Sequence, residues 1–365
     1  MFGFGRLATY DYFAHVARAL VKRFADAGKP LEPHVVDVSP TASIRRRAVR
    51  LAELVAKTAD DGAGTIHLLG HSTGGLDARL VSSPSARLPT AKENLAWLSR
   101  LRSVTTMSTP HYGTPLAGYF TTAAGTRMLY LLSLFTVTTL SLGRVPLSLF
   151  AGIMDHVGGL ERRLGIEIKP LDELLAQVLR FVSPAGRAEI DAYLRRVRGD
   201  QAGIVQLMPE VMELFNSAVH DHPAVRYGCV ATAAPAPGPR SLLSTLGSPL
   251  SAAQLAIYTT VYGVASHAAE RYPYATPTVQ QAELLARSWP AGVHPSSVDG
   301  IVPTLSMLWG ELLYCGAADH LDVVGHFDDG SEPRTHVDWL RSGARFDRPS
   351  FGAMADALCG FMLRG

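Results

Sequence analysis

Residues 70 to 74, Gly-His-Ser-Thr-Gly, place Ser72 directly after the apolar run Ile66 to Leu69. A serine in this setting sits on a sharp turn between a strand and a helix, which exposes its hydroxyl at the carboxyl edge of a parallel sheet. Flanking glycines omit Cβ atoms that would clash there, and the helix that follows directs its N-terminal amides at developing negative charge. The pattern predicts nucleophilic acyl chemistry at Ser72. The alternative is a glycine-rich turn without chemistry, since the motif also occurs by chance.

A serine hydroxyl is a weak nucleophile near neutral pH, so it needs a general base and a group that orients the base. When such a turn carries the nucleophile, the acid and then the histidine follow it in the chain. Asp299 lies in a turn-prone segment and His320 follows it in Asp319-His320-Leu321-Asp322. We expect these two as acid and base. The best rival base is His326, and the remaining candidates, interpreted as surface or structural residues, are His220, His222, His294 and His336.

The first 110 residues alternate helical and strand patterns, which is typical of a mostly parallel, doubly wound α/β sheet. Helices are expected from about residue 10 to 27 and after Ile44. Strands are expected at His34–Val38, Ile66–Leu69 and Arg102–Met107. These short alternating elements are the ones that would carry Ser72 to the edge of the sheet.

The pattern changes between residues 116 and 220, where strand-like segments disappear and helical periodicity takes over. We interpret this region as a helical cap or lid inserted into a core formed by residues 1–115 and 221–365. The sheet resumes at Val225–Val230. A helix around Leu305–Leu313 and a closing helix over Ser350–Leu363 are expected after it.

Charge and composition limit the classes of molecule that the protein is expected to bind. The 34 basic and 32 acidic residues leave a net charge of +2, which gives no electrostatic reason to expect nucleic acid or a strongly anionic membrane as partner. The basic run Arg45-Arg46-Arg47 is interpreted as the solvated face of a helix rather than a binding patch. The three cysteines lack metal-ligand spacing and are expected to be buried thiols, with a single disulfide as the alternative.

The sequence predicts neither a membrane-spanning segment nor a signal for export. Its longest uncharged apolar stretch, Met128 to Gly143, is shorter than the roughly 20 apolar residues of a spanning helix. The start of the chain lacks the basic and apolar regions of a signal peptide. The sequence as written therefore predicts a cytoplasmic protein without a membrane span, and secretion stays open if the true start lies upstream.

Five segments, in this order, resemble the bacterial true-lipase family of α/β-hydrolases, whose members act on triglycerides and other carboxyl esters. The first is the Ser72 segment, continued by Gly75. The others are Thr109-Pro110-His111-Tyr112-Gly113-Thr114, Gln206-Leu207-Met208-Pro209-Glu210 with Met212, Phe215 and Asn216, Asp299-Gly300-Ile301-Val302, and Asp319-His320-Leu321-Asp322. Together they span most of the chain.

The resemblance implies Ser72 as nucleophile, His320 as general base and then acid, and Asp299 as its orienter. It also implies a mobile, partly apolar lid within residues 116–220, with Met128–Gly143 as its most lipid-facing part. The alternative for that stretch is a buried core helix. No redox or organic cofactor is implied. The expected partners are a small ester or lipid substrate and, transiently, a lipid interface.

The sequence departs from the family at the oxyanion hole. In the family a strand ends in His-Gly and the next backbone N–H supplies one donor. Here Met1 and Phe2 align with the residues that follow His-Gly, so the first strand is expected to be missing. The Met1–Phe2 backbone and the Thr73 N–H are the expected donors. Losing one such donor costs on the order of 10²–10³ in rate.

A second departure concerns calcium, which in many members pins the histidine loop through an aspartate two residues beyond the catalytic histidine. Asp322 occupies that position, but residues 274 to 290 offer only Glu283 as the upstream partner. One carboxylate rarely makes a Ca²⁺ site. Asp322 is therefore expected either as a calcium ligand or as a loop or ion-pair residue.

Two further functions stay open. An acyltransferase that passes the acyl group to a lipid alcohol would use the same three residues. A non-catalytic hydrolase-like module, which binds apolar ligands or a partner, would explain the missing first strand.

Overall fold

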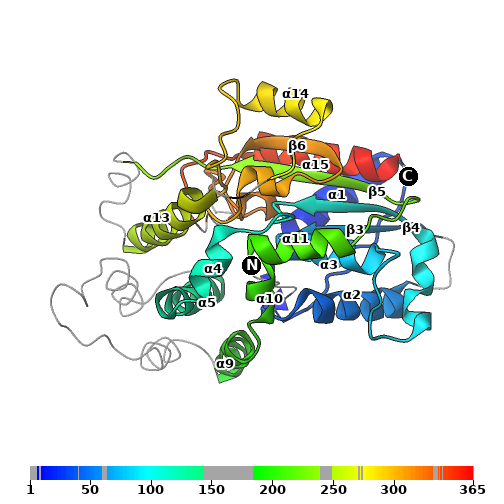
Figure 1. Ribbon diagram of the computed structural model, residues 1–365, viewed down its shortest axis with the longest axis horizontal. Coiled ribbons are helices and arrows are strands. Elements are labelled where there is room, and N and C mark those ends of the chain that lie inside the picture. Colours follow the sequence, from blue (N-terminus) through cyan, green and yellow to red (C-terminus); the bar gives the residue numbers. More distant parts are fainter. Residues whose placement is uncertain are drawn as a thin grey trace.

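Four parallel strands form the central sheet of the computed structural model (Figure 1). They pair in chain order as β3 (Ile66–His71), β4 (Leu101–Met107), β5 (Arg226–Ala233) and β6 (Glu311–Ala317). Two short strands, β1 (Arg6–Leu7) and β2 (Tyr10–Asp11), pair with each other in a separate antiparallel sheet. The structure describes residues 6–7, 10–39, 41–59, 64–142, 184–238, 249–269, 272, 274–331, 336, 338 and 340–364.

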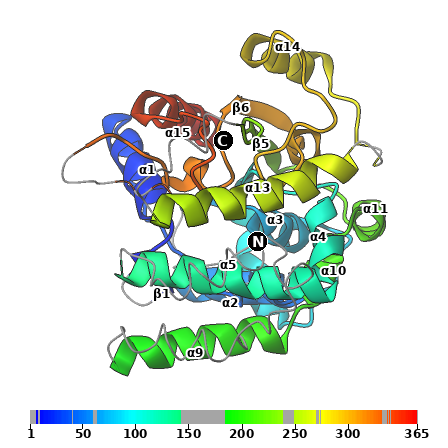
Figure 2. The same ribbon diagram turned by 90° about the vertical axis from the view of Figure 1, so that its left-hand side faces the viewer.

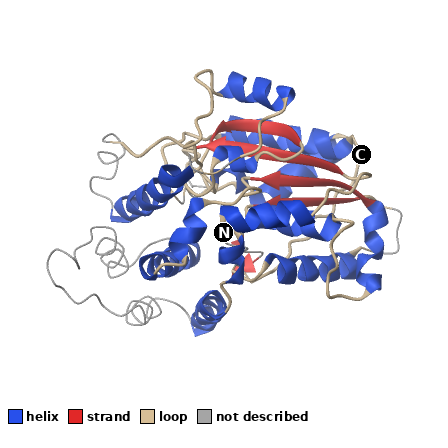
Figure 3. Cartoon of the chain, in the orientation of Figure 1, coloured by secondary structure: helices blue, strands red, loops and turns tan. Residues whose placement is uncertain are grey.

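Helices cover both faces of this sheet (Figure 3). α1 (Ala14–Asp26) and α15 (Arg348–Leu363) pack together on one face. On the other face α3 (Thr73–Ser82) contacts β3 and β4 and is backed by α2 (Ile44–Thr58), which also contacts the 3-10 helix η1 (Lys92–Arg100). α2 shows its apolar stripe directly, because Ile44, Ala48, Leu51 and Ala52 are buried. The layers are those expected of the α/β class.

Between β4 and β5 the described part of the chain forms helices joined by loops and no strand. Its helices are α4 (Pro115–Phe120), α5 (Ala123–Leu142), α9 (Pro184–Gly199), α10 (Ala202–Gln206) and α11 (Pro209–Ala218). Figure 2 shows α5 between α9 and α13 (Pro249–Ala269), with α14 (Val279–Ser288) further along the chain. Residues 143–183 of the expected cap lie outside the described residues.

The apolar stretch expected either on lipid or in the core is buried over its first half. The large side chains from Met128 to Phe135 are each at most 4% exposed, and they belong to the main apolar cluster with α13 and the loops that follow β6. This favours the core-helix alternative for Met128–Phe135. No helix in the described part of the chain is long and apolar enough to cross a membrane.

Two expected elements are wrong. Residues 34–38 form no strand, because no described strand pairs with this segment, although Val36 packs on the second apolar cluster. The helix expected over Leu305–Leu313 is instead a 3-10 turn, η2 (Thr304–Met307), followed by β6. The apolar spacing of that region fits a helix, but pairing with β5 determines the conformation.

A buried ion pair joins α2 and α3, the two helices that cover the same face of the sheet. Arg47 of α2 donates through Nε and Nη2 to the Asp77 carboxylate of α3, at 2.8–3.1 Å, and both side chains are at most 6% exposed. The basic run at residues 45–47 is therefore only partly a solvated face. Cys229, Cys315 and Cys359 are buried free thiols, as the sequence predicts.

Replacing Arg47 with methionine should lower the free energy of unfolding by about 3–5 kcal/mol, because it leaves the Asp77 charge buried without its partner. Arg46→Met is the matched control on the same helix. It breaks only the Arg46–Asp200 pair, in which Arg46 is 77% exposed, so a loss below about 1 kcal/mol is expected. Chemical denaturation of both variants measures the difference. Equal losses would contradict a dominant role for the buried pair.

Candidate active site

Ser72 occupies a strained turn between β3 and α3. Its φ is +53° and its ψ is −130°, a left-handed conformation that a residue with a side chain rarely adopts. The backbone is held by two hydrogen bonds, Ser72 N–H to the Met107 carbonyl at 2.9 Å and Gly75 N–H to the Ser72 carbonyl at 3.1 Å. Backbone strain at a single residue of this kind is typical of functional sites.

Glycine is required at two positions around this turn. A Cβ on Gly70 would lie 2.4 Å from the backbone of Gly74 and Gly75, and one on Gly75 would lie 2.3 Å from Thr109 Oγ1. A Cβ on Gly74 would meet nothing within 4 Å. The two close approaches therefore involve Gly70 and Gly75, and the clash expected at the second glycine of the pentapeptide falls one residue later.

Asp299 is fixed by its own loop. The loop closes through the Val298–Pro303 bridge, with Gly300 at φ +96°. Asp299 Oδ1 accepts hydrogen bonds from the N–H groups of Ile301 (2.9 Å) and Val302 (2.7 Å). These bonds occupy one carboxylate oxygen, so the other oxygen, Oδ2, is the one available to a partner side chain.

The partner is His320, which lies in the loop after β6. Its Nδ1–H donates to Asp299 Oδ2 at 2.7 Å, and its backbone N–H donates to the Asp299 carbonyl at 3.0 Å. Burial lowers the pKa of His320 well below 6.5, so the ring is neutral. Nε2 is buried and has no hydrogen-bond partner among the described residues. A neutral imidazole oriented through Nδ1 and open at Nε2 is ready to accept a proton.

Burial also raises the pKa of Asp299, to about 7, against the opposing effect of the Val302 and Ile301 N–H groups and the Ser108 hydroxyl. Ser108 follows β4, has φ +47°, and its hydroxyl lies 3.1 Å from Thr232 Oγ1. A second strained serine therefore lies beside the acid. The sequence offered no signal for it.

The sheet edge brings the expected residues together. Ser72 follows β3, His320 follows β6, and the Asp299 loop is attached to the end of β5 because Ala234 N–H donates to the Val298 carbonyl. His71 Nε2 lies 2.7 Å from the His320 carbonyl oxygen, so the residue next to Ser72 contacts the backbone of His320 directly. Carboxyl ends of parallel strands are where α/β sheets place their sites.

The rival histidines lie elsewhere. His326 is buried against the Tyr12 ring, at 5.3 Å between centroids, and His336 stacks on His15 at 3.9 Å. His294 bonds its neighbour Ser296 on the surface, and His220 and His222 are not buried. Among the described histidines, His320 is the one whose ring is hydrogen-bonded to the Asp299 carboxylate.

The structure describes one of the two expected sources of oxyanion-hole donors. Thr73 is the first residue of α3 and is buried beside Ser72, where a helix N-terminus presents unpaired N–H groups. Met1 and Phe2 lie outside the described residues.

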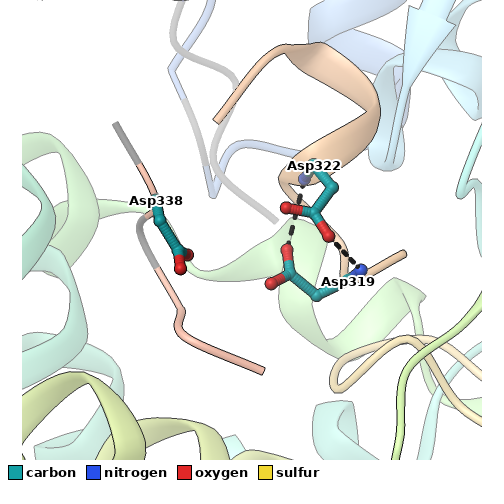
Figure 4. Close-up of side chains that lie close together, drawn as sticks. All are labelled: Asp319, Asp322 and Asp338. Atoms are coloured by element: carbon teal, nitrogen blue, oxygen red, sulfur yellow. Dashed lines mark hydrogen bonds between the residues drawn. The ribbon is translucent and has the colours of Figure 1, made fainter. Parts of the chain in front are cut away.

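Three carboxylates lie together, as Figure 4 shows, and two of them flank His320 in the chain. Ligand atoms of Asp319, Asp322 and Asp338 all lie within 4.8 Å of one another. Asp319 and Asp322 also bond each other's backbone N–H groups at 2.8 and 3.2 Å. Asp338 faces them from a separate segment of the chain. The carboxylates beside Asp322 are those of its neighbour Asp319 and of Asp338 downstream, whereas the family resemblance implies a partner upstream.

This cluster has the chemistry of a hard-cation site. Asp319 Oδ2 is buried without a hydrogen-bond partner among the described residues. Burial first and then the neighbouring carboxylates raise the pKa of Asp319 to about 7 and that of Asp322 well above its usual value. A divalent cation would offset this repulsion, and oxygen ligands are those that Ca²⁺ prefers. The residues present fit a calcium ion.

The parallel sheet, the helices on both faces and the strained serine between β3 and α3 make this an α/β-hydrolase fold. No protein-family model and no curated protein matches the chain. Among solved structures it is similar to EstA from Clostridium botulinum, at 18% identity over 96% of this chain and 84% of that chain, with a TM-score of 0.47. It is also similar to the lipase of Staphylococcus hyicus (16% identity, 94% and 88% covered, TM-score 0.48) and to lipase 1 of Pelosinus fermentans (14%, 92% and 90%, 0.46).

Proposed function

We propose that the protein is a serine hydrolase that cleaves carboxyl esters through an acyl-enzyme on Ser72. The observation that carries the proposal is the buried His320, which donates from Nδ1 to Asp299 at 2.7 Å while His71, the neighbour of Ser72, contacts its backbone at 2.7 Å. This arrangement supplies a nucleophile, a base and an orienter in the roles that acyl transfer requires.

In the proposed reaction Ser72 Oγ attacks the ester carbonyl while His320 Nε2 accepts the hydroxyl proton. Thr73 N–H stabilises the negative charge that develops on the carbonyl oxygen. His320 then protonates the leaving alcohol, which departs and leaves the acyl group on Ser72. In the second half His320 removes a proton from water, the hydroxide attacks the acyl-enzyme, and the acid is released as Ser72 regains its proton.

A fluorophosphonate probe tests the nucleophile. The probe is expected to add to Ser72, giving one modified peptide by mass spectrometry, together with hydrolysis of p-nitrophenyl esters. Asp299→Asn should react far more slowly, because the base loses its orientation. A protein that is neither labelled at Ser72 nor active on esters would instead be the non-catalytic module.

An acyltransferase differs from a hydrolase only in the acceptor. Product analysis with an added long-chain alcohol separates the two, because a transferase should form mainly the new ester whereas a hydrolase should release the free acid. We propose water as the acceptor. The proposed substrate is an ester or lipid, reached transiently at a lipid interface, because Ser72 and His320 are both buried in this conformation.

We further propose that Asp319, Asp322 and Asp338 hold a calcium ion. Bound there, the ion would neutralise the three carboxylates and fix the two segments that carry them. Asp319 and Asp322 flank His320 closely in the chain, so the ion would hold the loop that carries the base. The chemical steps themselves need no cofactor.

Chelation should therefore lower the stability of the protein. EDTA should reduce the apparent melting temperature and added Ca²⁺ should restore it, since a ligand at 100 times its Kd adds about 2.7 kcal/mol. Asp338→Asn should remove most of this calcium-dependent shift. Asp328→Asn is the matched control, because Asp328 is an exposed aspartate of the same loop region whose carboxylate accepts from the Gly330 N–H. A melting temperature that ignores both EDTA and Ca²⁺ would exclude the site.

A further inference from the structure

His71 makes two buried hydrogen bonds that the proposed reaction does not use. Its Nε2 lies 2.7 Å from the carbonyl oxygen of His320, and its Nδ1 lies 3.1 Å from the Tyr12 hydroxyl. His71 is 6% exposed, and its ring centroid is 4.7 Å from that of His320. Tyr12 precedes α1, so the contact joins the start of the chain, the turn at Ser72 and the loop of the base.

The hydrogen positions in this contact follow from chemistry. A carbonyl oxygen can only accept, so Nε2 of His71 carries the hydrogen and donates to His320. Burial, and secondarily His320, keeps the pKa of His71 well below 6.5, so the imidazole is neutral and its Nδ1 is an acceptor. The Tyr12 hydroxyl must then be the donor to Nδ1. Tyr12 thus selects the tautomer that allows His71 to hold His320.

This contact completes the anchoring of the base. The side chain and the backbone N–H of His320 both bond Asp299, through Oδ2 at 2.7 Å and through the carbonyl at 3.0 Å. The remaining polar group of the His320 backbone, its carbonyl, is the one that His71 occupies. The base is therefore held on one side by the residue that orients it and on the other by the residue covalently next to the nucleophile.

Tyr12 reaches the same loop a second time. Its ring lies 5.3 Å from the ring of His326, centroid to centroid, and its backbone is hydrogen-bonded to the His326 side chain. The His326 N–H in turn donates to the Leu321 carbonyl at 3.1 Å. Tyr12 therefore contacts the His320 loop directly, and indirectly through His71.

We propose that His71 and Tyr12 are positioning residues that fix the backbone of His320 relative to Ser72. The inference rests on the proposed serine hydrolase and deepens it. Neither residue exchanges a proton with the substrate. They keep His320 Nε2 at the distance from the Ser72 hydroxyl that proton transfer requires. A small misplacement of reacting groups lowers the rate steeply.

Three variants separate the bonds. Tyr12→Phe removes only the donor to Nδ1 and should lower kcat about 2- to 10-fold, the value of one hydrogen bond. His71→Leu removes both bonds and should lower kcat about 10- to 100-fold. His71→Gln keeps an amide donor at the position of Nε2 and should recover most of that loss. KM should change little in each, because the substrate is not contacted.

The matched control is His67→Leu, which changes a half-buried histidine on the same strand. His67 bonds Ser103 Oγ at 2.7 Å, remote from the triad, so its loss should leave kcat unchanged while reporting the cost of removing a histidine from β3. Melting temperatures of all variants show whether each is folded. Tyr12→Phe, which deletes a single oxygen, keeps the test valid if His71→Leu is unstable.

A double-mutant cycle with His320→Ala decides whether His71 acts through His320. If His71 acts through the base, His71→Leu should have no further effect on the residual rate when His320 is already alanine. Full additivity of the two changes, or equal kcat for His71→Leu and His67→Leu, would overturn the proposal. A wild-type protein without ester hydrolysis would instead reject the proposed function, so the two failures are distinguishable.

Discussion

Ser72→Ala is expected to lower kcat for p-nitrophenyl ester hydrolysis on the order of 10⁶-fold, the size of effect that loss of an activated nucleophile has in serine hydrolases of this logic. The fold should survive, because alanine keeps the Cβ and removes only the hydroxyl of a residue that is 3% exposed. Circular dichroism and the melting temperature of the variant check the second half of the expectation. Activity close to that of the unchanged protein would reject Ser72 as nucleophile.

A glycine at the same position gives a matched control with a different stability. Ser72 has φ +53°, and glycine adopts this region without the steric cost that a side chain imposes. Ser72→Gly should therefore be as inactive as Ser72→Ala but melt at a higher temperature, since strain at such a residue is worth about 1–3 kcal/mol. A lower melting temperature for the glycine variant would show that the turn is not strained.

Asp299→Asn is expected to lower kcat about 10⁴-fold with little change in stability. Asp299 Oδ1 accepts from two backbone N–H groups, so the amide oxygen of an asparagine must take that place. Its NH₂ group then faces His320 Nδ1 and forces the hydrogen onto Nε2. The base is left with a hydrogen where it needs a lone pair.

The measurement that isolates this effect is a comparison of kcat with the rate of fluorophosphonate labelling. Both should fall together, because both need a base at Nε2. Asp347→Asn is the surface control, since Asp347 only caps the start of α15. If Asp299→Asn retained rapid labelling, Asp299 would not be the residue that orients His320.

The pairing of Asp299 with His320 could be predicted from the sequence, because each residue lies in a short segment whose residue types already indicate its chemistry. Ser72 is set by glycines and an apolar strand, and the order of nucleophile, acid and base follows from the connectivity of the sheet. The positions of Asp299 and His320 needed no knowledge of distant contacts. The structure places them 2.7 Å apart.

What could not be predicted depends on long-range contacts. Asp338 comes close to Asp322 because a later segment folds back beside the His320 loop, and nothing in its immediate sequence indicates this. Tyr12 and His71 lie 59 residues apart in the chain, and no local pattern indicates the hydrogen bond of 3.1 Å between them. Leu305–Leu313 was expected as a helix because its apolar spacing fits one, whereas pairing with β5 makes part of it a strand. Of these residues, only Asp319 could have been predicted from the sequence, because it directly precedes His320.

The burial of Ser72 and His320, at 3% and 2% exposure, has a consequence for the choice of substrate. A substrate that binds only an open conformation has an apparent dissociation constant equal to the intrinsic one divided by the open fraction. An open population of about 1% thus weakens apparent binding about 100-fold. Small soluble esters bring little contact area with which to shift that equilibrium, whereas long acyl chains that contact the opened apolar surface bring more. If the proposed hydrolase takes its substrate only in such an open conformation, this equilibrium would favour esters with long acyl chains over small soluble ones.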